Sequence, residues 1–288
     1  MNPGPGFVKP TSGVAPSPQE SPNPADGTLP GPHDTFEYFP RYTKYPISAI
    51  GKLFFTKPGI GDFVCSAAVT AGSASVLNII WTAGHCVAQG GASSFYTNWY
   101  FCPAYDYPDN NGCGIYGGWS WLTVTTTSEW LSSGAFTRDY AIIGLAHTGS
   151  KYATDVVNIT GSLGFAWNWA RDQHWVHLGY PQGPPFTGGK LIATFTEHRA
   201  DDIPDVFGPP TNSWGSTQNG GSSGSPVIKG FNYCGSTTPP CGNPSGNNLI
   251  NSNVSYGYDS LPGELYGPYF DTTTCNFWKS NTGWPGSC

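Results

Sequence analysis

Hydrophobic positions from Ile47 onward come in short runs of β-branched and aromatic residues, separated by clusters of Gly, Pro, Asn and Ser. Such runs are typical of antiparallel β-strands joined by turns. No segment shows a strong helical periodicity. The pattern predicts an all-β protein with strands at Gly51–Thr56, Ser75–Thr82, Leu122–Thr127, Tyr140–Leu145, Trp175–Tyr180, Lys190–Thr196, Ser225–Ile228 and Asn248–Tyr256.

The first 45 or so residues have a different pattern, with few apolar residues before Phe36 and many prolines. Proline at this density removes backbone donors and enforces an extended chain, so we expect no packed core there. We therefore divide the chain into residues 1–45, a Pro-rich leader, linker or pro-segment, and residues 46–288, the folded domain.

Composition and charge narrow the classes of protein to which this chain can belong. The chain has 288 residues, of which 39 are Gly, 27 are Pro and one is Met, and this argues against a helical bundle. Its net charge of −6 and its lack of Lys/Arg clusters argue against nucleic-acid binding. The longest apolar run, around Val76–Trp81, is too short for a membrane helix.

Eight cysteines indicate an oxidising compartment, and so a secreted protein, although MNPGPGFVKP at the N-terminus has no signal-peptide pattern. The spacing suggests four sequential disulfides, each contributing roughly 2–4 kcal/mol. These are Cys65 with Cys86, Cys102 with Cys113, Cys234 with Cys241, and Cys275 with Cys288.

We predict no metal site. The chain contains no C-x-x-C pair, and His174 and His177 would point to opposite faces of a strand. The oxygen-rich set Asp106, Asp109 and Asn111 lacks the spacing of a calcium loop, so we interpret it as a solvated turn.

The loop Gly221-Ser222-Ser223-Gly224-Ser225-Pro226 is the strongest candidate for chemistry. Glycines beside a serine expose its hydroxyl and free amide groups for a developing oxyanion, but the hydroxyl needs a base. No histidine follows residue 198, so the base must precede the serine, which excludes the α/β-hydrolase order.

His85 is the candidate base, because it follows an apolar strand and adjoins Cys86, whose disulfide would fix its orientation. The carboxylate that orients it is best matched by Asp139, at the edge of an apolar strand, with Asp155 as a rival. The order His85, Asp139, Ser223 is the order found in chymotrypsin.

At these positions the chain resembles the chymotrypsin-fold serine peptidases. The segments T-A-G-H-C at 82–86, D-Y-A-I-I at 139–143 and G-S-S-G-S-P at 221–226 match the three signatures of that family. The last is closer to the secreted bacterial and fungal branch that includes the V8-like glutamyl endopeptidases. The likeness covers roughly residues 46 to 270, and three ordered motifs together are specific.

The resemblance implies two six-stranded antiparallel β-barrels with the active-site cleft between them. It implies a monomer that hydrolyses protein or peptide substrates through an acyl-enzyme, without a cofactor. The implied triad is His85, Asp139 and Ser223, and the implied oxyanion hole is formed by the amides of Gly221 and Ser223.

The resemblance also places a substrate-binding segment at Ser255-Tyr256-Gly257 and the floor of the specificity pocket near Thr217. Two positions depart from the family. Ser222 stands where trypsin-like enzymes have the aspartate that captures a new N-terminus. Val254 stands where glutamyl enzymes have a histidine, so we expect a neutral residue, apolar or small, on the acyl side of the cleaved bond.

Two other interpretations remain open. The chain could be a catalytically silent member of the fold that serves in adhesion or binding. It could also be a latent precursor in which residues 1–45 block the cleft or await removal.

Overall fold

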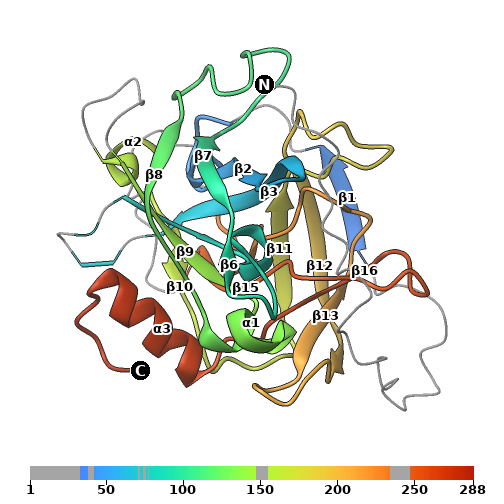
Figure 1. Cartoon of the computed structure of the whole chain (residues 1–288). Helices are drawn as coiled ribbons and strands as arrows, with labels where there is room; N and C mark the ends of the chain where they lie inside the picture. Colours follow the sequence, from blue (N-terminus) through green and yellow to red (C-terminus); the bar gives the residue numbers. More distant parts are fainter. Residues whose placement is uncertain are drawn as a thin grey trace.

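The computed structural model describes residues 33–37, 42–70, 72–73, 76, 78–146, 155–233 and 247–288. Strands are the main regular elements of these residues and lie mostly in two sheets (Figure 1). In this part of the chain, no helix is long and apolar enough to cross a membrane.

The first sheet is a closed six-stranded barrel, with the strand order β2-β3-β4-β9-β8-β7. Large side chains on its strands, such as Trp81, Phe101 and Trp119, are almost fully shielded from solvent. Its strands are β2 (Ile50–Lys57), β3 (Gly61–Thr70), β4 (Ile79–Thr82), β7 (Thr97–Pro103), β8 (Trp119–Thr126) and β9 (Ala141–Leu145). A small hairpin, β5 (Ala88–Gln89) with β6 (Ser94–Phe95), lies apart from it.

The second sheet has the order β10-β15-β14-β11-β12-β13-β16, with β1 added on β12. Ser252 Oγ in β15 donates over 2.9 Å to the carbonyl of Pro268, which directly follows β16, so these two strands approach each other. Its strands are β1 (His33–Glu37), β10 (Gly164–Phe165), β11 (His174–Gly179), β12 (Ile192–Asp202), β13 (Thr211–Gly215), β14 (Pro226–Lys229), β15 (Leu249–Asn253) and β16 (Glu264–Gly267).

This architecture confirms the prediction of an all-β, chymotrypsin-like fold with two barrel units. The second sheet has eight strands rather than six, because β1 and the two-residue β10 join it. All eight predicted strands are present with shifted ends. The prediction missed β3, β7, β13 and β16 and the two-residue strands β5, β6 and β10, where polar residues, glycine or shortness hide the pattern.

Strand β1 was not expected from the sequence. It pairs antiparallel with β12, from His33 opposite Thr196 to Glu37 opposite Ile192, and it covers the half of β12 that β13 leaves free. The Thr35 and Thr194 hydroxyls lie 3.0 Å apart. No proline occurs between Pro32 and Pro40, so this part of the Pro-rich segment can form a strand.

Helices among the described residues are few and short. They are α1 (Ser128–Ser133), α2 (Val156–Thr160) and α3 (Thr272–Thr282), with 3-10 turns η1 (Ile47–Ala49), η2 (Gly84–Cys86) and η3 (Phe136–Arg138). The sequence TTTCNFWKSNT of α3 has few strong helix formers, so periodicity did not reveal it. A capping box between Asp271 and Thr274 starts α3, and Gly283 with φ +64° ends it.

Three of the predicted disulfides are confirmed. Cys65 bonds to Cys86, Cys102 to Cys113 and Cys275 to Cys288. The predicted pair of Cys234 and Cys241 lies outside the described residues.

Candidate active site

His85 and Asp139 meet because β4 and β9 are neighbours in the first barrel, with Thr82 paired to Ala141. His85 lies in η2, which follows β4, and Asp139 lies between η3 and β9. The Asp139 carboxylate accepts the His85 backbone amide and contacts the ring Nδ1, each over 2.7 Å. Asp139 is 0% exposed, so solvent does not compete for these contacts.

The second barrel also holds Asp139. Ser255 Oγ donates to its Oδ2 over 2.5 Å, and Asn253 Nδ2 donates to its carbonyl over 3.1 Å. The rival carboxylate Asp155 instead accepts from Asn78 Nδ2 over 2.5 Å, beside α2. Of the two candidates, Asp139 is the one that contacts His85.

The other ring nitrogen of His85, Nε2, is buried and has no hydrogen-bond partner among the described residues. Because the Asp139 carboxylate can only accept, Nδ1 carries the proton of the neutral ring and Nε2 carries a lone pair. A free lone pair on an oriented imidazole is what a general base requires.

The loop that carries Ser223 packs against the segment that carries His85. A Cβ atom at Gly224 would lie 2.8 Å from the Ala83 amide nitrogen, two residues before His85. Gly221 and Gly224 have φ of +98° and +78°, a region that favours glycine. Ser223 itself is 3% exposed.

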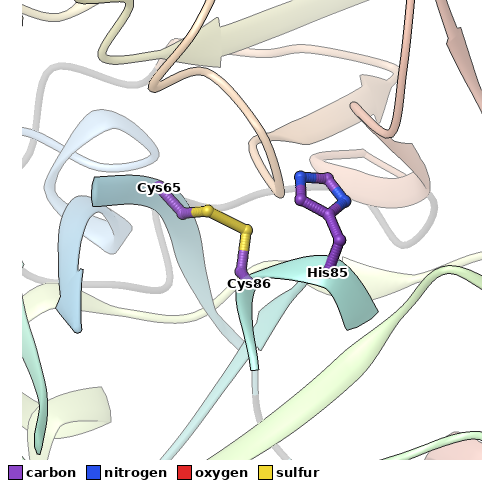
Figure 2. Close-up of side chains that lie close together, drawn as sticks. All are labelled: Cys65, His85 and Cys86. Carbon is purple, nitrogen blue, oxygen red and sulfur yellow. A yellow bond between two sulfur atoms is a disulfide. The ribbon is translucent and has the colours of Figure 1, made fainter. Parts of the chain in front are cut away.

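Ser66 connects this loop to the first barrel, beside Cys65. Its amide donates to the Ser223 carbonyl over 2.8 Å, and its hydroxyl donates to the Gly221 carbonyl over 2.9 Å. The adjacent disulfide to Cys86 lies next to the His85 ring (Figure 2). Ser66 and this disulfide thus bring the serine loop and the histidine to one place.

Backbone amides in the serine loop are free for a ligand. Asn219 to Ser222 form a turn in which the Ser222 amide donates to the Asn219 carbonyl over 3.1 Å. Within the described chain, the Gly221 and Ser223 amides have no hydrogen-bond acceptor. Two free amides beside one serine hydroxyl can stabilise an oxyanion.

The segment predicted to bind substrate lies beside Asp139. Tyr256 exchanges both backbone hydrogen bonds with Tyr266, over 3.2 and 2.9 Å. Gly257 has no backbone partner in the described ranges, so it presents an open edge to an extended chain.

The region around the predicted pocket floor is polar and uncharged. Thr217 is exposed, whereas its neighbour Gln218 is buried and donates to the Ile192 carbonyl over 3.0 Å. Residues 216–223 contain no acidic or basic side chain, and Val254 is buried.

In the described part of the chain, the possible metal-ligand groups are engaged in other bonds or lie apart. Cys65, His85 and Cys86 cluster, but the two sulfur atoms form a disulfide and so offer no thiolate (Figure 2). Asp106 and Asp109 each accept from Lys190 Nζ over 2.5 Å, so a lysine cation already balances their charge. On β11, the His174 side chain is exposed, whereas His177 is buried.

Comparisons with known proteins agree with this geometry. The chain is 33% identical to the thermostable serine protease AL20 from an extremophilic microorganism, with a TM-score of 0.67, covering 82% of this chain and 97% of that one. It is 28% identical to the protease Anisep from Arthrobacter nicotinovorans, with a TM-score of 0.66, covering 82% and 96%.

A Glu endopeptidase shares the fold, at 17% identity and a TM-score of 0.63, covering 88% of this chain and 99% of that one. No protein-family model and no curated protein matches the chain. The chain belongs to the chymotrypsin-fold serine proteases, and its fold is that of a serine protease.

Proposed function

We propose that this protein is a serine endopeptidase whose catalytic triad is Ser223, His85 and Asp139. The observation that carries the proposal is the His85 ring, which contacts buried Asp139 through Nδ1 and has a free Nε2. The serine loop packs against the same segment. Peptide or protein chains are the substrates, in agreement with the likeness of this chain to two proteases.

The first half of the reaction forms an ester. The Ser223 hydroxyl attacks the carbonyl carbon of the peptide bond while His85 Nε2 takes its proton. The amides of Gly221 and Ser223 stabilise the negative charge on the carbonyl oxygen. The carbon–nitrogen bond then breaks, and the leaving amine takes the proton from His85.

The second half hydrolyses the ester. Water attacks the acyl carbon and gives a proton to His85 Nε2, and the bond to Ser223 Oγ breaks as that proton returns to the serine. Asp139 stabilises the imidazolium that forms twice in the cycle. Every step uses groups of this chain and water.

For specificity, we propose a neutral residue on the acyl side of the cleaved bond, because residues 216–223 carry no charge.

For localisation and oligomeric state, we propose a secreted monomer. The disulfides favour an oxidising compartment. Light scattering of the purified protein measures its oligomeric state.

The triad is tested by intact mass after exposure to a fluorophosphonate probe, which reacts with activated serines. We expect one adduct on the wild type and none on Ser223→Ala, with peptide hydrolysis lower by several orders of magnitude in the variant. A folded wild type without an adduct would favour a binding protein or a latent precursor. Mass analysis of the N-terminus over time separates these two, because only a precursor would be trimmed.

A further inference from the structure

Four aromatic side chains form a cluster beside the proposed site, which we call the aromatic wall: Phe136, Tyr256, Tyr258 and Tyr266. The Tyr256 ring lies 4.7 Å from Phe136, 5.0 Å from Tyr266 and 5.5 Å from Tyr258, between ring centroids. A buried tyrosine packs through its ring, and its hydroxyl group also needs a hydrogen-bond partner.

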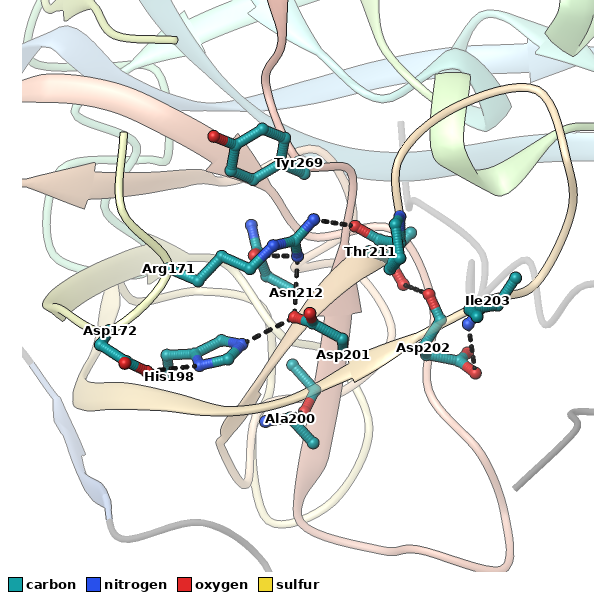
Figure 3. A network of polar contacts seen from close by, with 12 residues as sticks. Arg171, Asp172, His198, Ala200, Asp201, Asp202, Ile203, Thr211, Asn212 and Tyr269 are labelled. Atoms are coloured by element: carbon teal, nitrogen blue, oxygen red, sulfur yellow. Dashed lines mark hydrogen bonds and ion pairs between the residues drawn. The ribbon is translucent and has the colours of Figure 1, made fainter. Parts of the chain in front are cut away.

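Both hydroxyl groups find the same partner, the Asp202 carboxylate at the end of β12. Tyr256 donates to Asp202 Oδ2 over 2.7 Å and Tyr258 donates to it over 2.6 Å. The other oxygen, Oδ1, accepts the Ile203 amide over 2.9 Å (Figure 3). Asp202 is 7% exposed, so these are shielded, charge-assisted hydrogen bonds.

The aromatic wall adjoins the catalytic groups on two sides. Tyr256 follows Ser255, whose hydroxyl donates to Asp139, and precedes Gly257 with its open backbone edge. Phe136 precedes Asp139 by three residues in η3. A substrate chain that pairs with Gly257 therefore runs beside the wall.

The loop after Asp202 carries exposed apolar side chains and is attached to η3. Ile203 and Val206 are 62% and 90% exposed. Asp205 fastens the loop to η3, because its carboxylate accepts the Thr137 amide over 3.0 Å.

We propose that Asp202 is a positioning residue: it holds Tyr256 and Tyr258, which flank Gly257, and so fixes the backbone edge with which this protease grips extended peptides. The proposal rests on the proposed function. Asp202 does not touch the reacting atoms, so its effect depends on the length of the substrate.

The test is a series of peptide anilides lengthened from one to four residues on the acyl side, with apolar residues at the distal positions. For Asp202→Asn we expect kcat/KM for the four-residue substrate to fall about tenfold, mainly through KM, and the one-residue substrate to change less than about twofold. Tyr258→Phe removes one of the two hydroxyl groups from a half-buried ring. It should give a smaller loss with the same length dependence, and it tests the proposal even if Asp202→Asn fails to fold.

Asp201→Asn is the matched control, because this neighbouring carboxylate binds Arg171 and His198 instead of the tyrosines (Figure 3). It should leave the length dependence unchanged. The proposal is overturned if Asp202→Asn and Tyr258→Phe both keep the wild-type length dependence while Ser223 still reacts with the fluorophosphonate. Failure of the proposed function looks different, since Ser223 would then not react in any variant.

Discussion

His177 is fully buried in β11, and burial lowers the pKa of its imidazole to about 3. Trp214 Nε1 donates to its Nδ1 over 3.3 Å, so the neutral ring acts as an acceptor. An unfolded histidine titrates near about 6.5. His177 therefore stays neutral in the folded protein at pH values where the unfolded chain binds a proton.

This difference makes stability depend on pH. The contribution of His177 is complete above about pH 6.5 and is lost as the pH falls toward 3, with a slope near 1.4 kcal/mol per pH unit at most. We expect His177→Asn, which keeps an acceptor for Trp214, to lose less stability than the wild type between pH 6 and 4 (about two units). Urea unfolding at several pH values measures this, and parallel profiles of the two proteins would contradict it.

At the candidate active site, the sequence predicted some residues but could not decide between others. Motif order indicated His85 and Ser223, but two carboxylates were candidates for the third role. The choice of Asp139 depends on the pairing of β4 with β9, which brings residues 54 positions apart into contact. The bond from Ser255 to Asp139 had no local signal, because its two partners lie in different barrels.

Among the elements, β1 has the largest consequence for the N-terminal segment. It protects the backbone of β12 over Ile192–Thr196, and Phe36 stacks on Phe195 with ring centroids 5.6 Å apart. Thr194, opposite Thr35, also accepts from buried Gln218 over 3.1 Å. Part of the Pro-rich segment is thus connected to the loop that leads to Ser223.

We expect deletion of residues 1–37 to uncover this edge of the second sheet. Amide hydrogen exchange should become faster at the alternate amides of Ile192–Thr196 that point toward β1, because their edge partners are gone, whereas the amides that point toward β11 keep theirs. Exchange in the first barrel, for example at Ile142 and Ile143 in β9, serves as the internal control. Unchanged exchange in β12 would show that β1 does not protect it in solution.

Element prediction succeeded where β-branched and aromatic runs were continuous, as in β9 and β11. It failed for α3, whose start depends on the Asp271 cap rather than on its composition. Asp271 also binds Arg138 through two hydrogen bonds of 2.9 Å, which fastens α3 to the residue before Asp139. A cap that doubles as a tertiary ion pair is difficult to recognise in a sequence.

At the scale of the whole molecule, the site depends on how the two barrels meet. Ser66 is central, because its hydroxyl donates to the Gly221 carbonyl and accepts the Tyr180 amide over 2.9 Å. Both partners belong to the second unit, whereas Ser66 lies in β3. One buried hydroxyl therefore joins the barrels directly behind the serine loop.

We expect Ser66→Ala to slow the fluorophosphonate reaction about tenfold or more, because the Gly221 peptide group loses its anchor. Its stability should fall by only about 1–3 kcal/mol. The control is Ser48→Ala, which removes another buried hydroxyl, bonded to the Thr160 carbonyl over 2.6 Å, away from the site. Equal labelling rates for Ser66→Ala and the wild type would contradict the role of this contact.

The sequence by itself determined the all-β class, the order of the motifs and three disulfides, because turn residues, strand runs and cysteine spacing are local features. The placement of β1 and the choice of Asp139 over Asp155 depended on contacts between distant segments. So did the anchoring of Tyr256 and Tyr258 by Asp202. Tertiary structure decided these points. Strand pairing and the contact between the two barrels bring together residues that are far apart in the chain, and their spacing in the sequence does not indicate this contact.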